Sequence, residues 1–223
     1  MTDVARHIDH TILKATTVIS DIIQLCSEAA AYHFAAVCVP PNFVASAKKE
    51  LTGSDVKVAT VIGFPFGYSA IKAKLAEVDQ ALNDGAEELD IVINISALKN
   101  GSLDLLRNEI NTLLPPAHAA NSTVKTIIES GVLTDEEIVT CCRIYSEAGV
   151  DYLKTSTGYA ESGASIHAVQ LLKANLPSHI RIKASGGIRS LESVLNYINA
   201  GADRIGTSSG VGIMKQQQQL LKS

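Results

Sequence analysis

The stretch DYLKTSTG, residues 151–158, decides the fold. It begins as a short apolar strand and ends in small hydroxyl residues and a glycine, and it carries Lys154 at a place where side chains are expected to be buried. Burying a lone charge is costly, because desolvation disfavours the charged form. Lys154 therefore indicates a site at the end of this strand, although a lysine can also extend from a strand end into solvent.

Two further segments repeat this pattern. HIRIKASGGIR (179–189) carries Lys183 on an apolar strand before a glycine pair, and TVKTIIES (123–130) carries Lys125. Crowding and burial both lower the pKa of a lysine, and a lysine must lose its proton before it can attack a carbonyl. Three such lysines in consecutive strands predict the site of a Schiff-base enzyme.

Outward from these segments, the whole chain alternates between strand and helix patterns. The expected strands lie within 6–13, 34–41, 56–67, 88–95, 123–130, 151–158, 180–185 and 203–210. The first expected helix is capped by Ser20 or Asp21. The next cover 42–51, 69–83 and about 98–119, and another is capped by Thr134 with Glu137 three residues on. The last cover about 163–175 and 190–199 and follow 210.

Eight such repeats predict a (β/α)8 TIM barrel, an α/β fold, as a single domain over 1–223. The alternative is a doubly wound sheet, but the sequence has no GxGxxG or Walker A motif to favour it. A chain of 223 residues suits one undivided barrel.

Composition narrows the function classes. The net charge is −4, which argues against an electrostatic nucleic-acid surface. The apolar runs are too short for a membrane span, and the N-terminus lacks the pattern of a signal peptide, so we expect a cytoplasmic protein. The four cysteines include no CxxC and are expected to be reduced.

The segment ELDIVINI (88–95) contains a second kind of unexpected charge. Its period of two places Asp90, Val92 and Asn94 on one face, while the other face is wholly apolar. A buried carboxylate and a buried lysine can satisfy each other, as a structural ion pair or as part of a catalytic site. In a barrel, Asp90 and the three lysines would point into one site from the fourth to the seventh strands.

Small residues follow the last strands. The loops Ser185–Ile188 and Gly206–Ser209, with Thr157–Gly158, could cradle a phosphate through backbone N–H groups and hydroxyls, although glycine pairs also occur in ordinary turns. The histidines at 7 and 10 lack a metal-site spacing, so no metal is expected. Cys38, within an apolar strand, is interpreted as a core residue.

Several segments together resemble one family, deoxyribose-phosphate aldolase. They are IDHTIL (8–13), VCVPP (37–41), ELDIVINI (88–95), VKTIIES (124–130), YLKTSTGY (152–159), IKASGGIR (182–189) and IGTSSG (205–210). The resemblance implies reversible cleavage of 2-deoxy-D-ribose 5-phosphate to D-glyceraldehyde 3-phosphate and acetaldehyde, in deoxyribonucleotide catabolism, without metal or organic cofactor.

The resemblance also implies roles for individual residues. Lys154 resembles the Schiff-base lysine, Lys183 the neighbour that lowers its pKa, and Asp90 the acid that relays protons through a water. Residues matched to the substrate pocket are Asp9, Thr11 and Lys125, with Cys38 nearby; those matched to the phosphate loops are Gly158, Gly186, Gly187, Ser208 and Ser209.

Two departures from the family and two rival functions remain open. Some members end in a tail with a terminal tyrosine that assists proton transfer, whereas this chain ends QQQQLLKS, and some have a lysine where this chain has Tyr159. The rivals are another Schiff-base aldolase and a non-catalytic sugar-phosphate-binding barrel. Barrels of this size often pair, which allows a homodimer; no nucleic-acid or membrane partner is expected.

Overall fold

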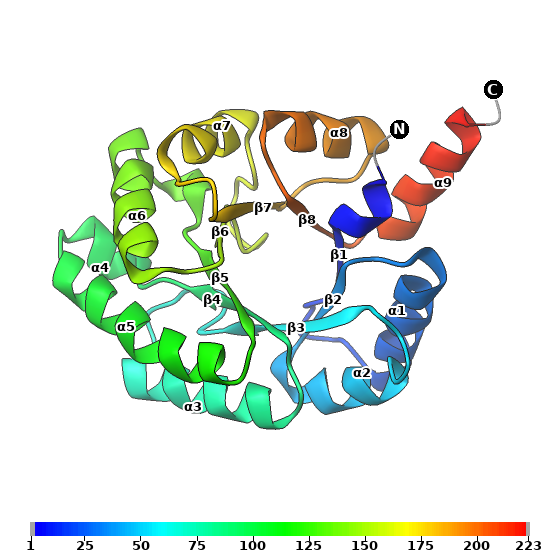
Figure 1. The fold of residues 1–223 in the computed structure, drawn as a ribbon, viewed down its shortest axis with the longest axis horizontal. Helices are drawn as coiled ribbons and strands as arrows, with labels where there is room; N and C mark the ends of the chain where they lie inside the picture. The colour runs from blue at the N-terminus through cyan, green and yellow to red at the C-terminus, as the bar shows by residue number, and fades with distance from the viewer. Residues whose placement is uncertain (1–2, 222–223) are drawn as a thin grey trace.

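The computed structural model describes residues 3–221 and contains a closed barrel of eight parallel strands. Figure 1 shows the strands in the centre with the helices around them. The strands are β1 (Ile8–Thr11), β2 (Ala36–Val39), β3 (Lys57–Ile62), β4 (Glu88–Val92), β5 (Thr123–Ile127), β6 (Tyr152–Lys154), β7 (Arg181–Ser185) and β8 (Arg204–Thr207). The predicted TIM barrel is confirmed.

The helices connect consecutive strands on the outside of the barrel. They are α1 (Ile19–Tyr32), α2 (Val44–Glu50), α3 (Ile71–Asn83), α4 (Ile95–Lys99), α5 (Leu103–Ala119), α6 (Asp135–Ala148), α7 (Ile166–Asn175), α8 (Leu191–Ala200) and α9 (Gly210–Leu220), with short 3-10 turns η1 (Val4–His7), η2 (Pro41–Phe43) and η3 (Ser130–Val132). Within residues 3–221, no helix combines the length and the apolar character needed to cross a membrane.

The core lies between the strands and the surrounding helices. Strands β2, β4 and β6 are buried along their whole length, as expected of parallel strands covered on both faces. Their outward side chains, such as Val37, Leu89 and Leu153, join one continuous apolar cluster with the helices. The inward side chains of the barrel are left to build a site.

The helix expected at about 98–119 is two helices in the structure. Asn94 accepts a hydrogen bond from Ala97 N at 2.9 Å and caps α4, so it lies outside β4 rather than on the strand face predicted for it. Gly101, at φ 67°, then separates α4 from α5. Pro115 and Pro116 lie inside α5, near its C-terminal end, and the helix continues to Ala119.

Two helix starts were predicted from capping residues, with different outcomes. Thr134 caps α6 as predicted, with Glu137 N donating to Thr134 Oγ1 at 3.3 Å and Thr134 N donating to Glu137 Oε2 at 2.8 Å. The cap of α1 predicted at Ser20 or Asp21 is wrong. Val18 is at the cap position and the helix begins at Ile19, because Asp21 reaches back and accepts a hydrogen bond from Val18 N at 2.9 Å.

Candidate active site

The strand register brings the predicted charged residues together inside the barrel. Asp90 on β4 is the register partner of Lys125 on β5, and Lys154 on β6 is the register partner of Lys183 on β7. All four side chains are buried, with Lys154 the most exposed at 3%. Buried charges of opposite sign are expected to pair, and these do.

Asp90 is the centre of the cluster. Its Oδ2 atom accepts hydrogen bonds from Lys154 Nζ at 2.7 Å and from Lys183 Nζ at 2.6 Å, and its Oδ1 atom accepts one from Lys125 Nζ at 2.9 Å. The pKa of Asp90 is held well below its usual value: burial opposes ionisation, and the charges of Lys125, Lys154 and Lys183 outweigh it. Asp90 is therefore a carboxylate that contacts the lysine amines directly.

A second layer of charge lies below Asp90, toward the N-terminal ends of the strands. Lys183 Nζ is 2.5 Å from Asp9 Oδ2, and Lys125 Nζ is 2.5 Å from Glu88 Oε2, as ion-pair contacts without hydrogen-bond alignment. Arg204 on β8 connects the two acids of this layer. Its guanidinium forms an ion pair with Asp9 Oδ1 and another with Glu88 Oε1, the latter at 2.8 Å. Lys125 Nζ is also 3.8 Å from Asp9 Oδ2, so Asp9 is placed beneath the site as a partner of three cations.

Sequence reasoning missed Glu88 and Arg204. Glu88 lies two residues before Asp90, so the period of two that placed Asp90 on the inner face places Glu88 there as well. Arg204 similarly begins β8, two residues before Gly206. Both residues are the first of their strands, where a charged side chain is usually solvated. Their charges were therefore not recognised as buried from the sequence.

The lysines differ in protonation. Burial lowers the pKa of Lys154 and the neighbouring charge of Lys183 lowers it further, against the opposing effect of Asp90. Burial also disfavours the charged form of Lys183, but Asp9 and Asp90 together outweigh it and raise its pKa. The pKa of Lys125 is raised in the same way by Asp90 and Glu88. Lys154 is therefore the lysine of the three that most readily becomes neutral.

A cavity of about 610 Å³ opens above this cluster at the C-terminal ends of the strands. Lys154 lines it, whereas Lys125 and Lys183 lie beneath. The other predicted site residues on its wall are Thr11, Gly158, Gly186, Gly187 and Ser208. Ser209 is not on the wall; its N–H donates to Thr207 Oγ1 at 2.9 Å, and Thr207 lines the cavity instead.

Three glycines on the wall have a backbone conformation that favours glycine. Gly158, Gly186 and Gly187 have φ of 87°, 93° and 80°, and a Cβ on Gly186 would come within 2.8 Å of Gly163 Cα. Within residues 3–221, the N–H groups of these three glycines have no protein acceptor. They are available to an anion in the cavity.

Two cations on the wall were not predicted. Lys14 and Arg189 both line the cavity, the first just after β1 and the second just after the loop that holds the glycine pair. Tyr159 also lines it, but its hydroxyl donates to Leu13 O at 2.6 Å and its ring meets Phe64 edge-on. Lys14 and Arg189 therefore supply positive charge in a cavity where Tyr159 supplies none.

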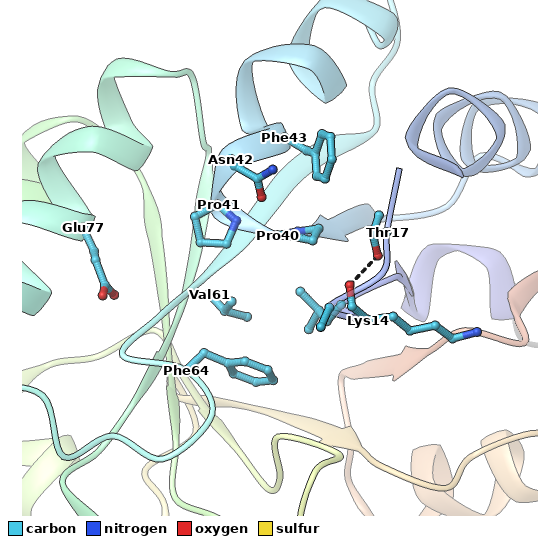
Figure 2. A pocket seen from close by; sticks show the side chains of 11 residues that line it. Lys14, Thr17, Pro40, Pro41, Asn42, Phe43, Val61, Phe64 and Glu77 are labelled. Carbon is cyan, nitrogen blue, oxygen red and sulfur yellow. Dashed lines mark hydrogen bonds between the residues drawn. The ribbon is translucent and has the colours of Figure 1, made fainter. Parts of the chain in front are cut away.

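Beside this cavity lies a smaller one of about 270 Å³, shown in Figure 2. Leu13 and Lys14 line both cavities. Figure 2 shows Val61 and Phe64 on the wall of the smaller cavity, with the amine of Lys14 pointing away from Phe64. The charge of Lys14 is thus not turned into this second cavity.

Cys38 is a core residue in the structure. It is buried in a small apolar cluster with Ala36, Ala59 and Val61, and it is not on the wall of the large cavity. Burial, with the nearby charge of Asp90, raises the pKa of its thiol to about 11. The interpretation as core packing agrees with this environment.

The two histidines near the start of the chain do not converge. His7 Nδ1 lies 2.8 Å from Asp203 O, whereas His10 Nε2 lies 2.7 Å from Glu28 Oε2. In the described part of the chain, no three His, Cys, Asp or Glu side chains are grouped so that they could hold a metal ion.

Comparison with known proteins agrees with this geometry. The model of the DeoC/LacD family aldolases matches residues 4–216. A deoxyribose-phosphate aldolase of Thermococcus gammatolerans is 48% identical over 215 residues, covering 96% of this chain and 96% of the relative. One of Treponema denticola is 46% identical over 209 residues, covering 94% and 97%.

A solved structure shows the same architecture. The tetrameric deoxyribose phosphate aldolase of Aeropyrum pernix superposes with a TM-score of 0.90 at 32% identity, over 97% of this chain and 92% of that one. The family model spans almost the whole barrel, including every strand that contributes a charge to the cluster. The chain belongs to the DeoC/LacD aldolase family.

Proposed function

We propose that this protein is a class I aldolase that reversibly cleaves 2-deoxy-D-ribose 5-phosphate to D-glyceraldehyde 3-phosphate and acetaldehyde through an imine on Lys154. Membership of the family and relatives named deoxyribose-phosphate aldolase support the reaction. One observation carries the assignment of the nucleophile. Of the three clustered lysines, Lys154 alone lines the cavity, and its pKa alone is lowered.

The substrate fits the cavity with its phosphate at the glycine loops. The free N–H groups of Gly158, Gly186 and Gly187 suit phosphate oxygens, and Lys14 and Arg189 supply charge. This placement leaves the carbonyl end of the sugar to approach Lys154. The geometry thus accounts for a phosphorylated substrate despite tyrosine at position 159.

The proposed chemistry depends on a neutral Lys154 amine beside the charged side chains of Asp90 and Lys183. The Lys154 amine adds to C1 of the open-chain sugar and water leaves, which gives a protonated imine. The C3 hydroxyl then loses its proton and forms the carbonyl of D-glyceraldehyde 3-phosphate, which leaves as the C2–C3 bond breaks. The electrons of that bond move into the imine to give an enamine. Protonation at C2 and hydrolysis release acetaldehyde and restore the amine.

Lys183 and Asp90 support these steps. Lys183 stays protonated between Asp9 and Asp90, and its charge favours the neutral form of Lys154. Asp90 contacts both amines through one oxygen, so it can accept a proton from one and return it, directly or through a water. The relay role of Asp90 is part of this proposal.

Borohydride reduction in the presence of substrate tests the proposal. We expect the peptide that contains Lys154 to gain either the reduced imine of the intact sugar phosphate or one ethyl group, the reduced imine of acetaldehyde. An added fragment that matches neither would indicate another Schiff-base aldolase. Tight binding of the sugar phosphate without any covalent adduct would indicate a binding protein and contradict the proposal.

The oligomeric state stays a prediction. The relative from Aeropyrum pernix was solved as a tetramer, which is a statement about that protein.

A further inference from the structure

The buried charges beneath Lys154 form a closed ring in which acids and bases alternate. In order around the ring they are Asp90, Lys125, Glu88, Arg204, Asp9 and Lys183, which returns to Asp90. No neighbouring pair is separated by more than 2.9 Å. The least buried member, Arg204, has a side chain that is only 13% exposed.

The ring is electrically balanced, and Lys154 is the seventh charge. Three carboxylates face three cations, and Lys154 joins the ring only through Asp90 Oδ2, from the cavity side. When Lys154 is protonated, the net charge of the cluster is one positive charge. When Lys154 is neutral, the net charge of the cluster is zero. Because an uncompensated buried charge is costly, Lys154 is the group whose deprotonation leaves the cluster balanced.

We infer that Glu88 and Arg204 are positioning residues that set the proton affinity of Lys154 through the charge balance of this ring, without touching the substrate. This inference rests on the proposed function, because it concerns the protonation state of the nucleophile. Both residues lie below Asp90 and neither lines the cavity. Their effect on Lys154 is therefore electrostatic, carried by the ring.

Loss of the Glu88 charge and loss of the Arg204 charge should shift the pKa of Lys154 in opposite directions. Removing the charge of Glu88 leaves the ring with a net positive charge, so Lys154 loses its proton at lower pH. Removing the charge of Arg204 leaves a net negative charge, so Lys154 keeps its proton to higher pH. Neither residue contacts Lys154, and a charge on the order of 10 Å away shifts a pKa by roughly one pH unit at an effective dielectric constant of about 20.

Other titratable groups near the cluster do not share this role. Burial raises the pKa of the Cys38 thiol and of the Tyr152 hydroxyl, so both stay neutral near pH 7, and Arg181 stacks on the Tyr152 ring. Glu129 holds Thr157 through its carboxylate. All four are present in every variant below, so they do not account for a difference between variants.

The test is the pH dependence of trapping at Lys154. Each protein is treated with acetaldehyde and cyanoborohydride from pH 5 to pH 10, and modification of Lys154 is compared in each digest with that of exposed Lys72. We expect the midpoint of the Lys154 profile to fall by about one pH unit in Glu88→Gln and to rise by about one pH unit in Arg204→Met. Each such shift corresponds to about a tenfold change in the trapping rate on the acid side.

Charge-conserving variants distinguish an electrostatic effect from a packing effect. Glu88→Asp and Arg204→Lys should leave the midpoint near that of the wild type. The double variant Glu88→Gln/Arg204→Met restores the balance and should return the midpoint toward the wild-type value. If Arg204→Met does not fold, Glu88→Gln/Arg204→Lys still predicts a downward shift.

The outcomes also separate this inference from the proposed function. A wild type that is not trapped at Lys154 contradicts the function itself. A wild type that is trapped, with single variants that lose rate but keep the wild-type midpoint, shows that Glu88 and Arg204 only hold the fold and overturns the inference. Shifts of the same sign in both single variants overturn it as well.

Discussion

Lys154 and Lys183 are register partners on neighbouring strands, yet their surroundings favour opposite protonation states. Lys183 lies between the carboxylates of Asp9 and Asp90, whereas Lys154 has only Asp90 and faces the cavity. In the proposed mechanism, the nucleophile and the fixed cation therefore differ by one additional carboxylate. Sequence alone could not assign the order, because both lysines end short strands before small residues.

A substitution at each lysine separates the two roles. In Lys154→Leu, borohydride trapping should be lost, because no other lysine lines the wall near the substrate carbonyl. In Lys183→Leu, trapping at Lys154 should persist but move to higher pH, because the positive neighbour that lowers the Lys154 pKa is gone. Mass spectrometry of the trapped peptides measures both effects, and Lys72→Leu on the exposed face of α3 is the control.

Trapping at Lys183 in the wild-type protein would reverse the two assignments. Retained trapping at Lys154 with an unchanged pH profile in Lys183→Leu would show that Lys183 does not act on the nucleophile.

At the scale of single residues, the sequence indicated the site through charged residues within apolar strands. Asp90, Lys125, Lys154 and Lys183 all stood out for that reason, and the structure brings all four together. Glu88, the first residue of its strand, did not stand out, because a charge there can reach solvent from a strand end. Only the neighbouring strands of a closed barrel exclude that solvent.

At the scale of elements, the loops after β6 and β7 fit together only without side chains. Gly186 approaches the backbone of Gly163 and of Gly158, at the point where the cavity wall turns. The close approach brings Gly158 and Gly186, whose N–H groups have no protein acceptor in residues 3–221, together on the cavity wall. In the proposed function, the shape that Gly186 gives this loop therefore places the groups that would receive the phosphate.

Gly186→Ala should weaken phosphate recognition. The new Cβ would lie 2.8 Å from Gly163 Cα, a backbone atom that cannot rotate away, and the residue would keep an unfavourable φ of 93°. With N–H groups displaced from the phosphate, we expect KM for the sugar phosphate to rise about tenfold, the effect of losing roughly one hydrogen bond. Cleavage of the unphosphorylated sugar should change much less.

Gly212→Ala is the matched control. A Cβ there meets nothing within 4 Å, and its steady-state kinetics should match the wild type. An unchanged KM in Gly186→Ala would contradict the placement of the phosphate at these loops.

Element boundaries were harder to predict than element types. In α3 the fully buried side chains are Lys74, Val78 and Ala81, while Leu75 and Leu82 are half-buried against the core. Apolar periodicity cannot show that Lys74 is buried, because its amine is satisfied by Glu109 on α5 and by Val92 O, each at 2.7 Å. Such a pair depends on packing between elements distant in the sequence.

At the scale of the whole molecule, the ring of charges and Lys154 connect every strand of the barrel except β2 and β3. Its six members and Lys154 come from β1, β4, β5, β6, β7 and β8. The alternation of strand and helix patterns was enough to predict the barrel, and the barrel was enough to predict that charged strand residues converge. The closed alternation of the ring could not be predicted, because it depends on the strand register.

Since these contacts connect distant parts of the chain, they should make the stability of the barrel depend on pH. The folded-state pKa values of Asp9 and Asp90 lie below their unfolded values, so the stability they contribute is present above about pH 4 and is lost as the pH falls toward the folded values. Lys125 and Lys183 have raised pKa values, so their contribution is lost only as the pH rises above about 10.

We therefore expect a broad neutral plateau in the free energy of unfolding, with a steep fall below about pH 4. Each carboxyl that takes up a proton only on unfolding adds a slope of up to about 1.4 kcal/mol per pH unit. Asp9→Asn should lower stability on the plateau, because Lys183 and Arg204 each lose a partner, and should reduce the acid slope. Asp104→Asn, at an exposed position on α5, should change neither. Urea unfolding followed by circular dichroism from pH 7 to pH 2 measures plateau and slope, and an acid slope in Asp9→Asn as steep as that of the wild type would show that the ring does not hold the barrel together.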